Sequence, residues 1–529
     1  MKNKFDAVVK LGKEKKEILL LVGISVLAFL FRILFLQANP PGLFCDEAST
    51  GYDAYSLLQT GRDQYGDFLP LFVRSMGDYN EALYRYLTIP SVALLGLSAF
   101  SVRLPAAVIG SLTVPVLYFL SRKLTDKSGA AAAAFFLAIS PWHIHFSRTA
   151  FRAILLPFFF SLGILFLIKA IQDHPGWYAP SGLVFGFSLW TYSASRVFIP
   201  LFIFFTVIML FYTNDIQSHP RYALSGGLIF SLILIGFFLF WISPEGVSRA
   251  RYELIASPLE WLKNYFSYFN PVNLFWRGDL NLRHSPTGIG QLHLFEFFFI
   301  LLGGFSCLRE RKISTGLLII WTLLYPIPAA FTAPMNALRS IMGAPLFAIF
   351  SGIGAVHFYK LIQTHVNRKR FYLLSTTFLM IVMVGVFIHR YFYLYPQYAA
   401  PYWQYGLKEV FQSLKQEKDS PVFISDQLFL PHIFILFFEQ HPPEEYQKNP
   451  VLTEQGNWEY TDQKIGRYEI DSLDDLPDYL SQNSSALIVI PTSQLHRLEL
   501  LDLTEPLESI ALPRGGDTFY IHQSSKPDQ

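Results

Sequence analysis

Charged residues are scarce in this chain of 529 residues, where Asp, Glu, Lys and Arg together make up 16%. Soluble globular proteins carry about a quarter. Hydrophobic residues reach 52%, and the mean hydropathy is +0.32. This balance excludes an ordinary soluble domain and predicts that lipid surrounds most of the chain.

Two further shortages narrow the class of protein. The net charge is only +2 and no basic tract alternates with aromatic residues, so we expect no nucleic-acid partner. Only two cysteines occur, Cys45 and Cys307, which excludes a disulfide framework. The topology argued below places them on opposite sides of the membrane, so we expect both to be packing residues.

Eleven apolar segments approach the length of about 20 residues that a membrane-spanning helix needs. They are 18–36, 103–121, 129–146, 153–171, 178–194, 197–213, 222–242, 292–308, 314–332, 338–360 and 371–392. The first follows a run of lysines and lacks a small-residue cleavage site, which predicts an uncleaved anchor with a cytoplasmic N-terminus. Arg32, near its outer end, is expected to extend to the membrane interface.

The segment 82–100 is treated differently because it is short and contains Pro90. Counted as a span, it would place the basic cluster at 122–127 outside. Counted as a helix on the membrane surface, it places that cluster inside, as the positive-inside rule prefers. The same rule puts the tail outside, and we expect a multi-pass protein of the cytoplasmic membrane.

A change of composition near residue 395 predicts two domains, 1–394 and 395–529. In the second, the short β-branched runs 422–426 and 486–490 are typical of buried strands, and "TFYIHQ" is a possible third strand. Helices are expected between the first two strands and at "DLPDYLSQN". The predicted fold is an all-α membrane domain of about eleven spans, with surface helices in the first outer loop, followed by a small extracytoplasmic α/β domain.

The first outer loop opens with two adjacent acids, Asp46 and Glu47, in "PPGLFCDEASTGYDA". Two interpretations are open at this point. The pair is either solvated charge at a helix start or the reactive end of an enzyme whose substrate is held in the membrane. The amphipathic stretch that follows would lie along the membrane surface, which favours the second interpretation.

Arginines stand near the outer ends of several predicted spans, where lipid-adjacent sequence normally avoids them. They are Arg148, Arg152, Arg196, Arg283 and Arg339, with His284 beside Arg283. Each arginine alone is explained by snorkelling or by pairing with Asp78, Glu81 or Asp279. As a group, they favour one anionic ligand, because the guanidinium fork matches a phosphate group.

A carboxylate beside such cations predicts group transfer from a lipid phosphate. The carboxylate takes a proton from the acceptor, and the arginines stabilise the negative charge on the departing phosphate. No cofactor is certain; a divalent metal is possible, with His284, Asp78 and Glu81 as candidate ligands, although their spacing matches no strong signature.

The acidic pair, followed by "GDYNEALYRYLTIPSVALLGLSAFSVRLPAAVIG" and "AISPWHIHFSRTAFRA", resembles the multi-span glycosyltransferases of the GT-C class. The nearest branch is glycosyltransferase family 39, with protein O-mannosyltransferases and the aminoarabinose transferase of lipid A. The resemblance covers about residues 18–390. It implies a polyprenyl-phosphate sugar donor, a site on the outer face, and Asp46 as catalytic base.

The chain departs from that family in two places. Many relatives carry a further acid in the stretch that corresponds to "SRTAFRAILL", and some carry "KPP" where this chain has "NEA" at 80–82. These departures bear on the acceptor, which is a lipid, a glycan or a protein.

The sequence therefore predicts a membrane glycosyltransferase, with roles assigned as follows. Asp46 is the general base and Glu47 orients the base or the acceptor. Arg148, Arg196, Arg339 and His284 bind the donor phosphate, and Asp78, Glu81, Arg283 and Tyr192 are further candidates. The alternatives are a lipid or polysaccharide transporter and a non-catalytic membrane assembly protein. Charges gathered at one face, rather than mid-membrane, argue against transport.

Overall fold

A computed structural model describes residues 2–524 apart from a few gaps. The gaps are 76–77, 244–245, 247–256, 287, 310–311, 364–367, 451–462, 484 and 500–505. The chain divides into two compact units. Unit 1 comprises Met1–Leu34 and Ala106–Tyr391, and unit 2 comprises Phe35–Pro105 and Phe392–Gln529.

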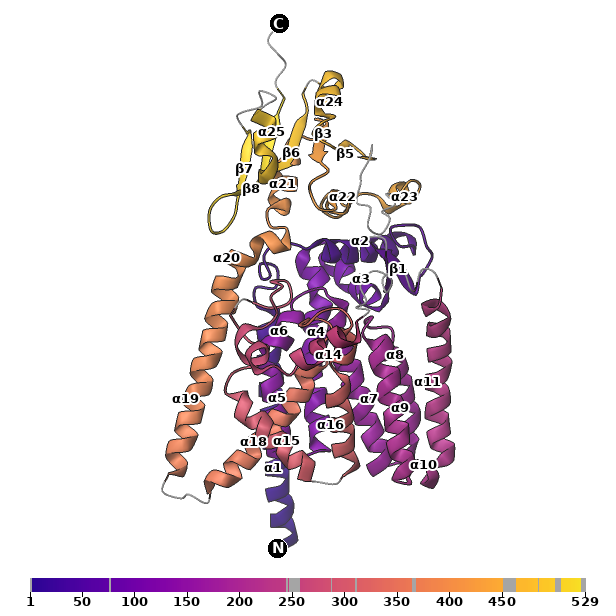
Figure 1. The fold of residues 1–529 in the computed structure, drawn as a ribbon, viewed down its shortest axis with the longest axis vertical. Coiled ribbons are helices and arrows are strands. Elements are labelled where there is room, and N and C mark those ends of the chain that lie inside the picture. The colour runs from indigo at the N-terminus through magenta and orange to yellow at the C-terminus, as the bar shows by residue number, and fades with distance from the viewer. Residues whose placement is uncertain are drawn as a thin grey trace. The chain divides into compact units, whose positions relative to one another are not determined.

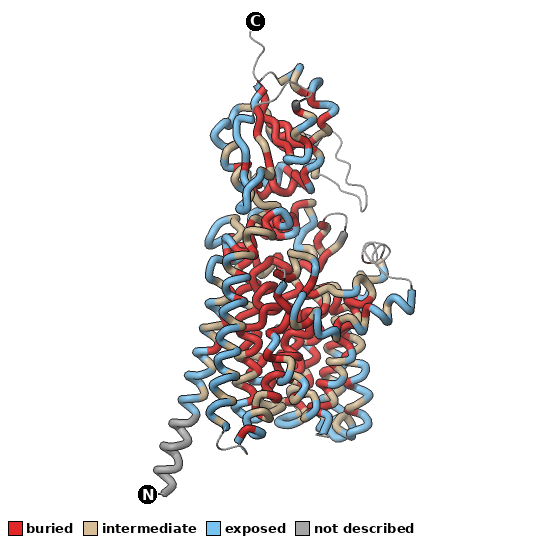
Figure 2. The backbone as a smooth tube through the Cα atoms, turned by 60° about the vertical axis from the view of Figure 1, so that its left-hand side comes forward, coloured by how far each residue is buried: buried red, intermediate tan, exposed pale blue. Residues whose placement is uncertain are grey.

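Unit 1 is a bundle of helices (Figure 1). Its long members are α1 (Lys2–Ile33), α5 (Lys127–Ile139), α7 (Leu155–Gln172), α8 (Tyr178–Ser188), α9 (Ser195–Tyr212), α11 (Pro220–Trp241), α15 (Glu296–Arg309), α16 (Ile313–Leu324), α18 (Gly343–Gln363) and α19 (Lys369–Ile388). Helix α4 (Ala99–Arg122) begins in unit 2 and continues into unit 1. The short helices α6 (Pro141–Phe146), α10 (Asp215–Ser218), α14 (Pro258–Ser267) and α17 (Ile327–Ala330) lie between them. In Figure 2, buried residues gather toward the centre of the bundle.

Each of the eleven predicted apolar segments contains a helix, although 129–146 and 314–332 are each divided between two helices and α8 ends at Ser188 within 178–194. Within the described residues, seven helical stretches are long and apolar enough to cross a membrane, the longest being Lys369–Trp403. Helices α5, α8 and α15 are shorter than this length. The reason is visible for α5. The predicted segment 129–146 breaks at Ser140, where Pro141 starts α6 and the Ser140 hydroxyl accepts from the His143 amide at 3.3 Å.

Close helix packing in unit 1 depends on glycine. Helices α15 and α18 cross where Gly303 and Gly354 face each other's backbones. A Cβ on Gly303 would lie 2.0 Å from the Phe350 carbonyl oxygen, and one on Gly354 would lie 1.8 Å from that of Phe299. Only glycine permits this approach, as is common between helices in lipid, where dispersion contacts and close packing hold helices together.

Arg32 corrects one expectation from the sequence. Its side chain does not extend to an interface but is fully buried. The guanidinium donates to the carbonyl oxygens of Ala28, Leu137 and Ala138 at 2.9, 3.2 and 3.1 Å, and it contacts His143 Nδ1 at 2.8 Å and Ser147 Oγ at 3.2 Å. With every donor satisfied, Arg32 joins α1 to the corner between α5 and α6.

The first outer loop forms two helices and a hairpin in unit 2. They are α2 (Cys45–Thr60), α3 (Leu83–Leu95), β1 (Phe72–Ser75) and β2 (Asp78–Glu81). The strands pair antiparallel, with Phe72 opposite Glu81. The segment 82–100, predicted to be a surface helix, thus contains the short helix α3, which packs against α2.

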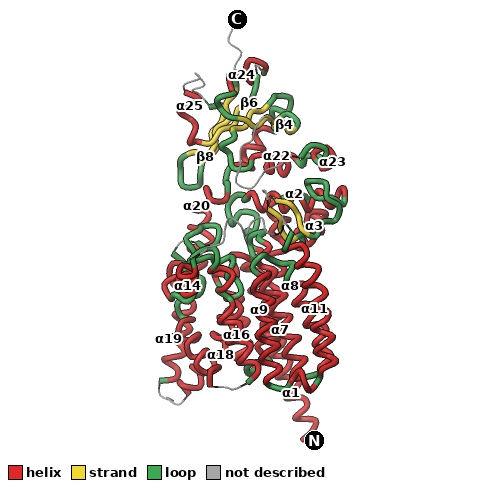
Figure 3. Tube along the Cα trace, turned by 45° about the vertical axis from the view of Figure 1, so that its right-hand side comes forward, coloured by secondary structure: helices red, strands yellow, loops and turns green. Residues whose placement is uncertain are grey.

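The C-terminal part of unit 2 contains a six-stranded sheet in the order β4-β5-β3-β6-β8-β7 (Figure 3). The strands are β3 (Val422–Ser425), β4 (Gln463–Ile465), β5 (Tyr468–Asp471), β6 (Leu487–Pro491), β7 (Glu508–Ala511) and β8 (Asp517–Gln523). Strand β3 is parallel to β5 and β6, and β4, β7 and β8 pair antiparallel at the margins. Its buried core includes Phe423, Leu476 and Ile488. The three predicted strands are confirmed as β3, β6 and β8.

The helices of this C-terminal part are α20 (Tyr395–Ala399), α21 (Leu407–Leu414), α22 (Pro431–Glu439), α23 (Pro443–Tyr446), α24 (Leu476–Gln482) and α25 (Leu495–Glu499). Helices α22 and α24 lie where the sequence predicts helices. Figure 3 shows α22, α24 and α25 beside the yellow strands.

The first outer loop and the tail share one compact unit because polar contacts join them. The Gln447 amide donates to Ser56 Oγ, Thr60 Oγ1 and the Asp63 carbonyl oxygen at 3.0, 3.1 and 2.9 Å. The Cys45 amide donates to Gln404 Oε1 at 2.8 Å. Composition alone places a boundary after residue 394, whereas the contacts group 35–105 with the tail.

Two buried acids stabilise the loop after α2. Asp53 pairs with Arg85 at 2.6 Å, with both side chains buried. Asp63 Oδ1 accepts from the amides of Tyr65 and Asp67 at 2.9 and 3.0 Å. Burial, with the nearby charge of Asp53, raises the pKa of the Asp63 carboxyl to about 7.

Candidate active site

The acidic pair lies in the first turn of α2, where the helix dipole favours negative charge. Its two members differ in environment. The Asp46 side chain is exposed, whereas Glu47 is fully buried. Only Asp46 is therefore open to a substrate in this conformation.

Glu47 is held by Arg103. Arg103 Nε donates to Glu47 Oε1 at 2.9 Å, and Arg103 Nη2 donates to Oε2 at 2.7 Å. The remaining guanidinium donors reach the carbonyl oxygens of Leu36, Pro40 and Gly42 at 3.2, 2.9 and 2.9 Å. Both side chains of the pair have zero exposure. This bidentate clamp holds Glu47 at the start of α2 and leaves its side chain no exposed surface.

The remaining acids predicted in unit 2 lie on β2. Glu81 ends the strand and is buried, and the side chain of Asp78 lies outside the described residues. Among the described residues, no group of three or more His, Cys, Asp and Glu side chains could hold a metal ion. The described candidates do not fit a metal, and no catalytic step is assigned to one.

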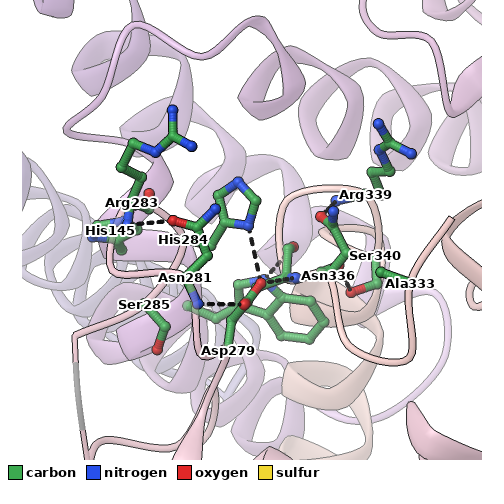
Figure 4. A network of polar contacts seen from close by, with 12 residues as sticks. His145, Asp279, Asn281, Arg283, His284, Ser285, Ala333, Asn336, Arg339 and Ser340 are labelled. Atoms are coloured by element: carbon green, nitrogen blue, oxygen red, sulfur yellow. Dashed lines mark hydrogen bonds and ion pairs between the residues drawn. The ribbon is translucent and has the colours of Figure 1, made fainter. Parts of the chain in front are cut away.

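In unit 1, Asp279 is the centre of a polar network (Figure 4). Its Oδ1 accepts from the Asn281 amide at 2.9 Å, and its Oδ2 accepts from the Ala337 amide at 2.8 Å. His284 Nδ1 lies 3.0 Å from the same Oδ2. Asp279 therefore joins two loops, one containing His284 and the other containing Ala337.

Arg283 and Arg339 extend from these two loops. Asn281 Oδ1 accepts from the Arg283 amide at 3.0 Å, and Asn336 Oδ1 accepts from the Arg339 amide at 2.9 Å. In Figure 4, both guanidinium groups lie on the same side of the network. Both side chains are partly exposed. In both loops an asparagine side chain thus accepts from the backbone amide of the predicted arginine, and the arginine side chain is partly exposed.

His145 and Arg148 form a buried layer next to this network. His145 Nε2 contacts the Arg283 carbonyl oxygen at 2.8 Å, and its Nδ1 lies 3.2 Å from the Tyr391 hydroxyl. Arg148 is fully buried, donates to the Phe31 carbonyl oxygen at 2.9 Å, and lies 5.8 Å from the centre of the Tyr391 ring. Arg148 is therefore enclosed by the bundle in this conformation, and its guanidinium group is not exposed to a ligand.

Arg196 and Tyr192 occupy the start of α9 and the turn before it. The Arg196 guanidinium lies 5.7 Å from the centre of the Phe237 ring and donates to the Gly246 carbonyl oxygen at 3.3 Å. Tyr192 is buried, and the Arg152 guanidinium lies 5.4 Å from the centre of its ring. Arg196 is partly exposed, as a residue that binds an anion requires.

Comparison with known proteins gives one family match and several structural matches. Residues 82–241 match the family described as dolichyl-phosphate-mannose-protein mannosyltransferase. No curated protein matches the chain. Crystal structures of ArnT from Cupriavidus metallidurans are similar at 12% identity. The apo form has a TM-score of 0.61 and the alignment covers 98% of this chain and 100% of that one.

The ArnT form bound to undecaprenyl phosphate has a TM-score of 0.58, over 96% of this chain and 98% of that one. The chain has a GT-C glycosyltransferase fold. The oligosaccharyltransferase AglB from Archaeoglobus fulgidus, in complex with an inhibitory peptide and a dolichol phosphate, has a TM-score of 0.50 at 13% identity. That alignment covers 86% of this chain and 62% of AglB. The family match and the fold together indicate a glycosyltransferase, as the sequence predicts.

Sequence reasoning missed two residues of this GT-C chain that organise the candidate site. Arg103 appears in the motif "SVRLPAAVIG" but had no assigned role, and Asp279 was considered only as a partner for arginine. A signal existed for Arg103, because an arginine at the start of a span needs a buried partner and Glu47 is an acid near a span end. No comparable signal marks Asp279 in "RGDLNLRH".

Proposed function

We propose that this glycosyltransferase moves a sugar from a polyprenyl-phosphate-linked donor to an acceptor on the outer face of the cytoplasmic membrane. Three findings support the donor class. The matched family is described by its dolichyl-phosphate-mannose donor. The similar ArnT structure contains undecaprenyl phosphate, and the similar AglB structure contains a dolichol phosphate.

Asp46 is the proposed general base. The observation that carries this assignment is the contrast within the acidic pair, where Asp46 is exposed and Glu47 is clamped by Arg103. A base must reach its proton, and it must keep its position during the reaction. The clamp on the neighbouring residue restrains the backbone of Asp46 while its carboxylate stays open.

The proposed reaction has one displacement step. The acceptor oxygen or nitrogen attacks the anomeric carbon of the sugar, and the bond from that carbon to the phosphate oxygen breaks. The bonding electrons leave with the phosphate, and the acceptor proton passes to the Asp46 carboxylate. Cations near the phosphate lower the barrier, because they stabilise charge that increases in the transition state.

The proposed phosphate-binding residues are those of unit 1. Arg339, Arg196 and His284 are partly open. Asp279 orients His284 and, through the Ala337 amide, the loop that contains Arg339. Arg283 and Tyr192 are secondary candidates, and the buried Arg148 contributes through its charge and through Tyr391. The acceptor is a lipid, a glycan or a protein.

The experiment that tests the function uses purified full-length protein in detergent with polyprenyl-phosphate sugars labelled in the sugar. Transfer to a membrane extract, or release of the labelled sugar to water, is measured by thin-layer chromatography as disappearance of the intact labelled donor. Consumption of one or more donors supports the proposal. If every polyprenyl-phosphate sugar tested stays intact while a nucleotide sugar is consumed, the proposed donor class is wrong.

The donor site is tested with Arg339→Ala and Arg196→Ala, and Arg221→Ala is the control. Arg221 is an exposed arginine in the first turn of α11 that has no assigned role. A charge-assisted bond contributes about 1.5–3 kcal/mol, so each site variant is expected to weaken donor use by about ten- to a hundredfold. Unchanged donor dependence in both variants removes these arginines from the site.

A further inference from the structure

A polar cavity lies at the helix ends of unit 1 on the side that the sequence predicts to be cytoplasmic. Its volume is about 370 Å³. Its walls are the loop between α4 and α5, the end of α15, the start of α16 and the end of α18. The roles proposed for the acidic pair and the outer arginines do not use this cavity.

The charge of the cavity is predominantly positive. Lys123, Lys312 and Lys360 line it. Lys123 is compensated, because its Nζ lies 2.6 and 2.7 Å from the two carboxylate oxygens of Asp173. Lys360 has neither a hydrogen bond nor an ion pair within the described part of the chain, and its side chain is exposed at the rim. At least one full positive charge is therefore available to a ligand.

The acid and the histidine in the wall are already engaged. Asp126 caps α5 and accepts from the Gly129 amide at 2.9 Å. His357 Nδ1 lies 3.0 Å from the Ile353 carbonyl oxygen, which leaves Nε2 as the free nitrogen of the ring. The Asp126 carboxylate keeps its negative charge while it caps α5, so the three lysines and this one acid give the lining residues a net charge of +2.

Two hydroxyl-bearing residues also line the cavity. Ser314 and Thr315 line it, each is 8% exposed, and within the described residues neither hydroxyl has a hydrogen-bond partner. They belong to the first turn of α16, whose N-cap residue Lys312 makes no side-chain capping bond. The hydroxyl groups of these two largely buried residues and the backbone amides at the start of α16 are donors that an anion in the cavity would satisfy.

We propose that this cavity binds a phosphate group, with Lys312 and Lys360 as the cations and Ser314 and Thr315 as hydroxyl donors. Lysine binds phosphate as a point charge, and basic pockets between transmembrane helices on the cytoplasmic side hold anionic lipid headgroups. The phosphate belongs either to an anionic lipid of the inner leaflet or to a soluble phosphorylated compound. The site is separate from the donor-phosphate residues, which lie near the other ends of the helices.

The test measures ligand binding to the full-length protein by native mass spectrometry from a neutral detergent. The probes are dioleoyl phosphatidylglycerol, dioleoyl phosphatidylcholine and inorganic phosphate. The site variants are Lys312→Gln with Lys360→Gln, and separately Ser314→Ala with Thr315→Val. The control is Lys369→Gln, which removes a lysine at the start of α19 that does not line the cavity.

We expect phosphatidylglycerol to bind more tightly than phosphatidylcholine, and the double lysine variant to weaken it about tenfold or more. The hydroxyl variant weakens it less, and Lys369→Gln leaves it unchanged. If inorganic phosphate binds with the same dependence on the variants and phosphatidylglycerol does not, the ligand is a soluble phosphate compound. If neither probe shows binding that depends on Lys312 and Lys360, the proposal is wrong. We expect the double lysine variant to transfer sugar at the parental rate. Loss of phosphate binding in this cavity can therefore be distinguished from loss of the proposed catalytic function.

Discussion

Replacement of Arg103 by methionine is expected to destabilise unit 2 strongly. Both partners of the Arg103–Glu47 pair have zero exposure, and the substitution leaves a carboxylate buried without a counter-charge. Breaking a buried pair in this way costs about 3–5 kcal/mol. For a unit of about 150–250 residues, each kcal/mol corresponds to about 2–4 °C in Tm. We therefore expect the Tm to fall by about 6–20 °C.

The companion variant Glu47→Gln separates the charge effect from simple loss of packing. In the Arg103→Met background, Glu47→Gln removes the orphaned charge, so the double variant is expected to be more stable than Arg103→Met alone. The expected coupling energy is about 1–3 kcal/mol in a double-mutant cycle. Arg62→Met is the control, because Arg62 is an exposed arginine of the same unit.

The assay is thermal unfolding of purified protein in detergent, combined with hydrogen exchange at residues 45–48. Loss of the clamp releases the first turn of α2, so exchange there is expected to accelerate in Arg103→Met and to stay unchanged in Arg62→Met. A Tm within about 2 °C of the parent, together with unaltered exchange at the start of α2, refutes the reasoning that the clamp fixes this turn.

Three further predictions concern Asp63, Arg32 and Arg339. The folded state retains the Asp63 proton up to about pH 7, whereas the unfolded chain loses it near pH 4, so the free energy of unfolding falls as pH rises between these values. Asp63→Asn should remove this slope from a Tm measurement over pH 4–8; a persistent slope assigns it to another group. Arg32→Met should lower the Tm by about 5 °C or more, because it leaves buried acceptors unpaired; an unchanged Tm contradicts the structural role of its five contacts. Arg339→Lys should recover only part of the donor use lost in Arg339→Ala, since lysine lacks the planar fork, and full recovery would show that charge alone is sufficient.

The membrane helices are the part of the fold that the sequence predicts best. A run of about 20 apolar residues has few alternatives to a helix in lipid, because every backbone polar group must be satisfied internally. Strands β4, β5 and β7 were missed for the opposite reason. Segments such as "QKI" and "YEID" are short and partly polar, and their strands depend on neighbours in the sheet: "YEID" pairs with β3, and "QKI" pairs with "YEID".

The sequence predicts the residue types of the candidate site, but it predicts less well which of these residues contact one another. The adjacent acids mark the start of α2, but only the fold shows that one is exposed and that the other meets Arg103, which lies 56 positions away. Arg32 shows the same limit. An arginine near a span end suggests snorkelling, whereas three backbone carbonyl oxygens and the side chains of His143 and Ser147 hold it inside the bundle.

The central claim is that Asp46 is the general base, and the rate of sugar transfer by Asp46→Asn tests it most directly. The substitution is nearly isosteric and removes only charge and basicity. The control is Asp67→Asn, an exposed acid in the same outer loop. The account predicts that turnover falls by about a hundred- to ten-thousandfold in Asp46→Asn, with donor binding and Tm unchanged, and that Asp67→Asn retains parental turnover. Transfer by Asp46→Asn at the parental rate would contradict the account.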